Sequence, residues 1–179
     1  MIDHLLLTLT NLAAIPSIVL AYNIGAYEKC LCLILACFFS IIYHASETRF
    51  YGPALFDLKM TNLLILLQLD RFFAHLAVLV VGNFEILSKQ YPLIISVLSL
   101  LFFSEHIYYL QLSSINFRIL RVISHCFWHI GAFYIAFIAI RDYNNHPNVM
   151  HQIISFTGFW IYLICTVVYW SVLSNYTSY

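Results

Sequence analysis

Two histidines spaced four residues apart, His125 and His129, interrupt a long apolar stretch of the sequence. Residues four apart lie on the same face of a helix, so a helix through this stretch presents both imidazoles together. Such a pair offers two nitrogen ligands to one metal ion. A third histidine from another helix would complete a three-nitrogen site with one position open to water, which is the arrangement of catalytic zinc.

A candidate third ligand, His44, lies near the end of another apolar stretch, and Ser40 stands one helical turn before it. Asp70 lies inside a further apolar stretch. An ionised side chain at the centre of a bilayer costs at least about 2.5 kcal/mol, so ionisable residues within membrane spans are candidates for function. The candidates in this chain are His44, Asp70, Arg71, His75, Glu105, His106, His125 and His129.

Two structural interpretations of these residues stay open. The imidazoles of His125 and His129 can pack in the bundle or lie at the membrane interface without binding a metal. Arg71 and Glu105 fall in neighbouring apolar stretches, and they can pair with each other only to hold two helices together. In both interpretations, no charged side chain faces the lipid without a partner.

A b-type haem site is a more distant alternative. Axial histidines from two helices can sandwich the iron, and His75, His106 and His125 are available for this. Haem ligands face each other across a wide planar gap, whereas His125 and His129 on one helix face suit a small ion. The pattern therefore favours a single metal ion.

The composition indicates which elements must hold these residues. The chain has 179 residues, of which 63% are hydrophobic and 9% are charged, and its eight basic and eight acidic residues cancel. So few charges cannot cover a water-soluble surface, and their balance gives no attraction to nucleic acid. We expect one transmembrane domain over residues 1–179, a multi-pass protein integral to the membrane. Neither the membrane nor the oligomeric state is indicated.

Apolar stretches divided by polar clusters predict about six spans, because a bilayer core of about 30 Å takes roughly 20 helical residues. Unsatisfied peptide groups are costly in hydrocarbon, and no stretch alternates as a barrel strand does, so the expected fold class is all-α, a polytopic helix bundle. The predicted spans are 5–22, 29–46, 60–81, 91–112, 115–140 and 153–173. Two crossings separate the second span from the fifth, which places His44 and the His125/His129 pair at a comparable depth.

The positively charged residues that flank the predicted spans do not orient the chain. They divide four against three, with Arg49, Lys59, Arg118 and Arg121 on one side and Lys29, Lys89 and Arg141 on the other. A bias this small does not decide the orientation by the positive-inside rule.

The motifs Ser40-Ile-Ile-Tyr-His44, Asp70 and His125-Cys-Phe-Trp-His129 resemble those of the CREST-type seven-helix membrane hydrolase superfamily. This superfamily contains alkaline ceramidases, adiponectin-receptor-like proteins, GPI-anchor lipid-remodelling proteins and the myomaker group. Segments 7–16 and 38–45 look most like the myomaker group and its relatives linked to GPI-anchor phospholipase activity. The resemblance covers roughly residues 5–140. One span, where the family usually has three, separates Asp70 from His125, so we expect a reduced version of the seven-helix fold.

The resemblance implies a zinc-dependent hydrolase of a membrane lipid amide or ester, ceramide-like or phospholipid-like, with His44, His125 and His129 as the zinc ligands. It gives Asp70 the role of accepting or orienting the proton of the attacking water. Ser40 would hydrogen-bond the developing oxyanion or that water. The alternative that the same resemblance allows is a non-catalytic, zinc-stabilised bundle acting in membrane fusion, lipid sensing or signalling. Which bond is cut is not indicated.

Overall fold

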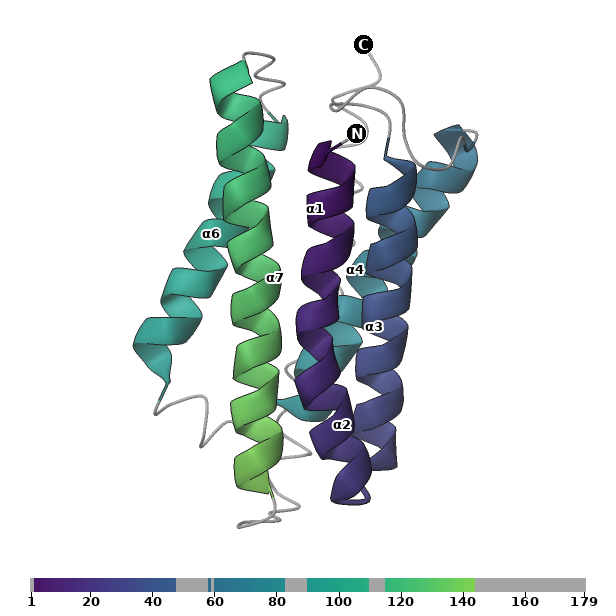
Figure 1. Cartoon of the computed structure of the whole chain (residues 1–179), viewed down its shortest axis with the longest axis vertical. Coiled ribbons are helices and arrows are strands. Elements are labelled where there is room, and N and C mark those ends of the chain that lie inside the picture. Colours follow the sequence, from purple (N-terminus) through teal and green to yellow (C-terminus); the bar gives the residue numbers. More distant parts are fainter. Residues whose placement is uncertain (1, 48–57, 59, 83–89, 110–114, 144–179) are drawn as a thin grey trace.

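A computed structural model describes residues 2–47, 58, 60–82, 90–109 and 115–143 of the chain. Every regular element in these ranges is a helix (Figure 1). The elements are α1 (Ile2–Thr10), η1 (Asn11–Ala14), α2 (Ile15–Asn23), α3 (Tyr27–Ser46), α4 (Met60–Val81), α6 (Tyr91–Tyr109) and α7 (Ile115–Tyr143). The all-helical prediction is confirmed for this part of the chain.

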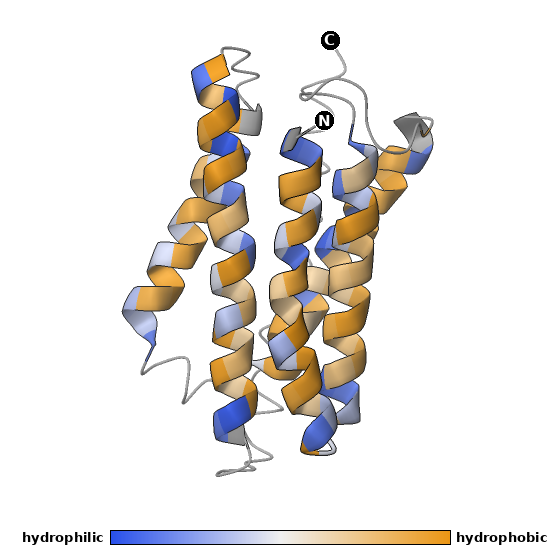
Figure 2. Cartoon of the chain, viewed as in Figure 1, coloured by the Kyte–Doolittle hydropathy of each residue, from blue (hydrophilic) through white to orange (hydrophobic). Residues whose placement is uncertain are grey.

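Within the described residues, four helical segments are long and apolar enough to cross a membrane: Asp3–Asn23, Tyr27–Ser46, Asn62–Val81 and Ile115–Asp142. They match the predicted first, second, third and fifth spans. Helix α6 stands at the predicted fourth span with a shorter apolar stretch, Tyr91–Ile107, and the predicted span 153–173 lies outside the described residues. Hydrophobic residues dominate these helices along their length (Figure 2).

The first membrane segment is a helix with a tighter turn, η1, in its middle. Pro16 has no N–H to bond the Leu12 carbonyl four residues before it, and that carbonyl instead accepts the N–H of Ile15. The Asn11 side-chain amide bonds the Leu7 carbonyl at 3.0 Å at the start of this turn. The turn therefore begins directly after Thr10, whose side chain takes part in the site described below.

A tight turn at Gly25 reverses the chain between α2 and α3. Gly25 has a φ of +75°, a left-handed conformation that glycine adopts without steric cost. The N–H of Ala26 bonds the Ala21 carbonyl at 2.9 Å, and the N–H of Gly25 bonds the Tyr22 carbonyl at 3.0 Å. This pattern is the Schellman helix end, and it allows α3 to pack directly against α2.

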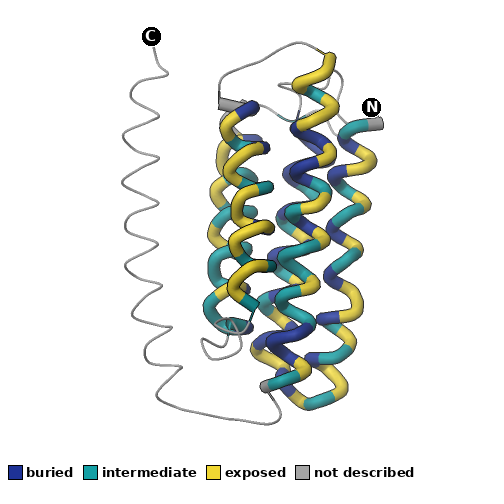
Figure 3. The backbone as a smooth tube through the Cα atoms, turned by 90° about the vertical axis from the view of Figure 1, so that its left-hand side faces the viewer, coloured by how far each residue is buried: buried dark blue, intermediate teal, exposed yellow. Residues whose placement is uncertain are grey.

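The segment formed by α1, η1 and α2 lies between α3 and α7, while α4 packs against α3 and α6 packs against α7 (Figure 1). Buried and exposed positions alternate along the helices, as expected for a bundle with an apolar outer surface (Figure 3). Small side chains let the helices approach closely in the core. That core contains Ala21, Cys30, Leu33, Ala36, Ala77, Val81, Ala139 and Ile140.

Helices α6 and α7 meet closely at Gly131. A Cβ atom at this position would overlap the Val97 side chain, so only glycine permits the present spacing. The two helices run in opposite directions, and Ser104 lies two turns from Val97 on the same face of α6. The Gly131 contact thus sets the distance at which Ser104 meets α7.

Two residues that the sequence analysis assigned to the flanking charges are buried in the bundle. Lys29 is only 5% exposed, and its ammonium donates to the Val80 carbonyl in the last turn of α4, where carbonyls lack helical donors. Arg121 is 2% exposed, and it pairs with Glu47. Neither Lys29 nor Arg121 is therefore a solvated flanking charge, because each has a partner that only the folded bundle supplies.

Candidate metal centre

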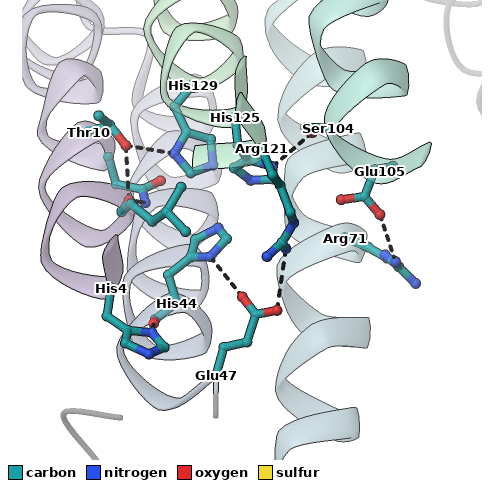
Figure 4. A network of polar contacts seen from close by, with 12 residues as sticks. His4, Thr10, His44, Glu47, Arg71, Ser104, Glu105, Arg121, His125 and His129 are labelled. Carbon is teal, nitrogen blue, oxygen red and sulfur yellow. Dashed lines mark hydrogen bonds and ion pairs between the residues drawn. The ribbon is translucent and has the colours of Figure 1, made fainter. Parts of the chain in front are cut away.

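The structure brings His44 of α3 together with His125 and His129 of α7. All three side chains are buried, and one potential ligand atom from each lies within 4.8 Å of the other two. The ring centroids are 4.9 Å apart for His44 and His125, 5.2 Å for His44 and His129, and 4.7 Å for His125 and His129. The predicted proximity of the three histidines is confirmed, and they lie close enough to bind one metal ion (Figure 4).

A hydroxyl group fixes the tautomer of His129. The Thr10 hydroxyl donates its single proton to the Leu7 carbonyl at 2.9 Å. The Thr10 oxygen also lies 3.0 Å from Nδ1 of His129, and here it can only accept. His129 therefore carries its proton on Nδ1, which leaves the lone pair of Nε2 free to bind a metal.

The same arrangement recurs at His125 with residues from another helix. The Ser104 hydroxyl donates to the Leu101 carbonyl at 2.9 Å, and its oxygen lies 3.1 Å from Nδ1 of His125. Nδ1 is again the donor and Nε2 the lone-pair atom. Helix α6 thus fixes one imidazole of α7, and α1 fixes the other.

A carboxylate takes the corresponding position at His44. Oε2 of Glu47 lies 3.7 Å from Nδ1 of His44, and Oε1 accepts a hydrogen bond from Arg121 at 3.3 Å (Figure 4). Burial alone would raise the pKa of the Glu47 carboxyl, but the His44 ring and the Arg121 charge outweigh burial and hold this pKa below its ordinary value. Glu47 is therefore ionised and orients His44 through Nδ1. The backbone carbonyl of His44 contacts Nδ1 of His4 at 3.1 Å.

These contacts prepare the triad for a metal ion. Each Nδ1 atom faces an oxygen outside the triad, which is how metal-binding histidines are usually oriented. Both ring nitrogens of His44 are buried and have no hydrogen-bond partner among the residues that the structure describes. A buried nitrogen without a partner is costly unless something binds it. Three imidazoles suit zinc, copper, nickel or iron, so the donor set fits a metal.

The triad lies in the wall of a cavity of about 890 Å³. Ser40, Asp70 and the three histidines all line this cavity. Ser40 is buried one turn from His44, and its hydroxyl lies within hydrogen-bonding reach of the half-buried Asp70 carboxylate. The five residues singled out in the sequence thus surround one space, formed by α3, α4 and α7.

The other polar candidates lie on the wall formed by α4 and α6. Arg71 and Glu105 form an ion pair with a distance of 3.5 Å, so the predicted pairing of these neighbouring helices is confirmed (Figure 4). His75 and His106 also line the cavity but are not part of the histidine triad.

Four residues that contact the triad directly or through Glu47 were missed in the sequence: Thr10, Glu47, Ser104 and Arg121. Glu47 follows His44 by three residues, and Arg121 precedes His125 by four, so helical spacing could have indicated both. Thr10 and Ser104 carry no such signal because they belong to other helices.

No protein-family model, curated protein or solved structure matches the chain.

Proposed function

We propose that the chain is a multi-pass membrane hydrolase that cleaves a lipid ester or amide with zinc held by His44, His125 and His129. The observation that carries this proposal is the approach of one ring nitrogen from each of the three histidines to within 4.8 Å of the others, in the wall of a cavity that Asp70 also lines. No fourth histidine, cysteine or carboxylate joins the triad among the described residues. Three protein ligands with a position left for water are typical of catalytic zinc, whereas structural sites have four.

The reaction that this arrangement supports is acyl hydrolysis. Zinc held there would act as a Lewis acid and lower the pKa of a water molecule. The water could then lose a proton and attack a carbonyl at neutral pH. The water oxygen bonds the acyl carbon while the ester C–O or amide C–N bond breaks, which releases a fatty acid and an alcohol or amine. Asp70 takes the proton of the water and gives it to the leaving group, and the Ser40 hydroxyl donates to the carbonyl oxygen as charge develops there.

The apolar part of the cavity supports a lipid as the substrate. Small side chains line it on the three helices that carry the polar groups: Ala36, Ala77, Ala132, Ala136 and Ala139. The helical rise from His129 to Ala139 is about 15 Å along α7. This length of apolar wall beside the triad gives room for an acyl chain while its carbonyl lies at the metal.

We further propose that the chain is a reduced relative of the seven-helix hydrolases that its motifs resemble. The supporting geometry is the meeting of the Ser40/His44 helix, the Asp70 helix and the His125/His129 helix around one cavity. The family usually has three spans between the Asp70 helix and the His125/His129 helix, and this chain has one. Removing two crossings leaves the start of the histidine helix on the same side of the membrane, so the three helices can still meet.

Incubation of the purified protein with mixed ceramides and phospholipids, followed by mass spectrometry of free fatty acids, tests the proposal. We expect release that Ser40→Ala and His129→Ala abolish. Ser17→Ala is the matched control, because it also removes a buried hydroxyl, which donates to the Phe133 carbonyl, and Ser17 itself does not line the cavity. Absence of release from every lipid class, with zinc bound and all its positions filled by protein atoms, would instead support the non-catalytic bundle.

A further inference from the structure

Among the described residues, two arginine–carboxylate pairs lie inside the bundle, and their side chains differ in exposure. The side chains of Arg121 and Glu47 are 3% and 1% exposed, although Arg121 reaches the cavity wall. Those of Arg71 and Glu105 are 16% and 28% exposed, and both residues line the cavity. A pair that only joins two helices needs no accessible surface. The Arg71/Glu105 pair therefore offers its charges to whatever fills the cavity.

The charges on this wall select the ligand. Arg71 presents a planar guanidinium that binds phosphate oxygens well, and Glu105 presents a carboxylate that attracts an ammonium group. Asp70 lies beside them and adds a second carboxylate to the cavity wall. An anionic headgroup would meet two carboxylates, and an uncharged headgroup would leave both charges of the pair unused.

We propose that Arg71 and Glu105 bind the headgroup of a zwitterionic phospholipid, with the phosphate at Arg71 and the ammonium of choline or ethanolamine at Glu105. This inference rests on the proposed function, and it names the substrate class of the same cavity. The headgroup lies against α4 and α6, opposite the triad wall formed by α3 and α7, with Asp70 between them. The acyl carbonyl then faces the triad and the acyl chain follows the alanine-lined wall.

Binding of ether-linked phospholipids tests the headgroup site without any hydrolysis, because an ether has no acyl bond to cleave. Native mass spectrometry of the zinc-loaded protein would count bound ether-linked phosphatidylcholine, ether-linked phosphatidylglycerol and dialkylglycerol. We expect phosphatidylcholine to bind at least about tenfold more tightly than the other two, which corresponds to one charge-assisted contact. Equal binding of the three lipids would overturn the proposal.

Variants separate headgroup binding from a purely structural pair. Glu105→Gln keeps the shape of the side chain and should remove most of the preference for phosphatidylcholine. The charge swap Arg71→Glu with Glu105→Arg restores an ion pair between the helices but reverses the order of the charges. A preference kept by Glu105→Gln, or restored by the swap, would assign the pair a structural role only. Arg118→Gln is the control, because it removes an interhelical ion pair, with Asp3, that does not line the cavity.

The same measurement on His129→Ala distinguishes this inference from the proposed function. A headgroup preference that persists in this variant, without fatty acid release from ordinary ester lipids, shows the binding site to be independent of catalysis. If the wild-type protein hydrolyses phospholipids and ceramides equally while binding the three ether lipids equally, the proposed function stands and the headgroup site is wrong.

Discussion

Oε2 of Glu47 faces Nδ1 of His44 at 3.7 Å, with both side chains 1% exposed. This contact gives His44 the orienting oxygen that Thr10 and Ser104 give to the other two histidines. A carboxylate in this position also makes the imidazole a better metal ligand, because it stabilises positive charge on the ring. The triad is thus fixed by residues from α1, the end of α3 and α6.

Replacement of Arg121 by Met should strongly destabilise the protein. It leaves the Glu47 carboxylate buried without its guanidinium partner, and breaking a buried ion pair in this way typically costs about 3–5 kcal/mol. Thermal unfolding in detergent measures the loss. Arg118→Gln, which breaks the more exposed pair with Asp3, should cost about 0–1 kcal/mol. Equal effects of the two variants would show that the Glu47 pair does not stabilise the bundle.

Thr10→Val and Ser104→Ala should each weaken zinc binding by about 10- to 100-fold. Both remove the oxygen that holds a histidine proton on Nδ1, and loss of such an outer contact typically has an effect of this size. Competition with a zinc chelator measures the affinity. Ser17→Ala also removes a buried hydroxyl that bonds another helix, but Ser17 does not contact the triad. The zinc affinity of this variant should therefore match that of the wild type. Unchanged zinc affinity in Thr10→Val and Ser104→Ala would show that these hydroxyls do not contribute to metal binding.

Asp70→Asn should lower lipid hydrolysis while zinc remains bound. The substitution keeps the side-chain shape but removes the base that accepts the proton of the water, and general-base catalysis typically contributes about 10²- to 10⁴-fold. Rates of fatty acid release and metal content are measured on the same preparation. If the variant instead loses its metal and fails to assemble, Asp70 has a structural role.

Gly131→Leu should separate α6 from α7. A side chain at this position overlaps Val97, and overpacking of a tight contact typically costs about 1–3 kcal/mol. The same movement carries Ser104 away from His125, so zinc affinity should fall together with thermal stability. Ile130→Leu alters the neighbouring exposed residue of α7 and should change neither zinc affinity nor thermal stability. A stable Gly131→Leu variant with full zinc affinity would show that this contact does not position Ser104.

The sequence predicted the helices and the triad because both depend on periodicity. Apolar stretches of membrane length predicted the spans, and helical spacing placed His125 with His129. Counting the crossings then placed His44 at the same depth, where the structure has it. These inferences require only the 3.6-residue repeat and the thickness of a bilayer.

The contacts around the triad could not be predicted in this way. Thr10 and Ser104 are ordinary helix residues, and their role depends on how α1 and α6 are rotated toward α7. That rotation is set by side-chain packing, such as the contact of Val97 with Gly131, rather than by hydropathy. Arg121 was counted among the charges that flank the spans because charged residues near span ends are usually solvated, whereas here Arg121 and Glu47 neutralise each other.

Zinc content of the purified wild-type protein and of His125→Ala is the most direct test of the metal centre. We expect one zinc per wild-type chain and its loss in His125→Ala, because two remaining histidines rarely hold zinc in an apolar site. His106→Ala, a histidine of the same cavity outside the triad, should keep its zinc. Undiminished zinc content in His125→Ala would show that the histidine triad does not hold the metal.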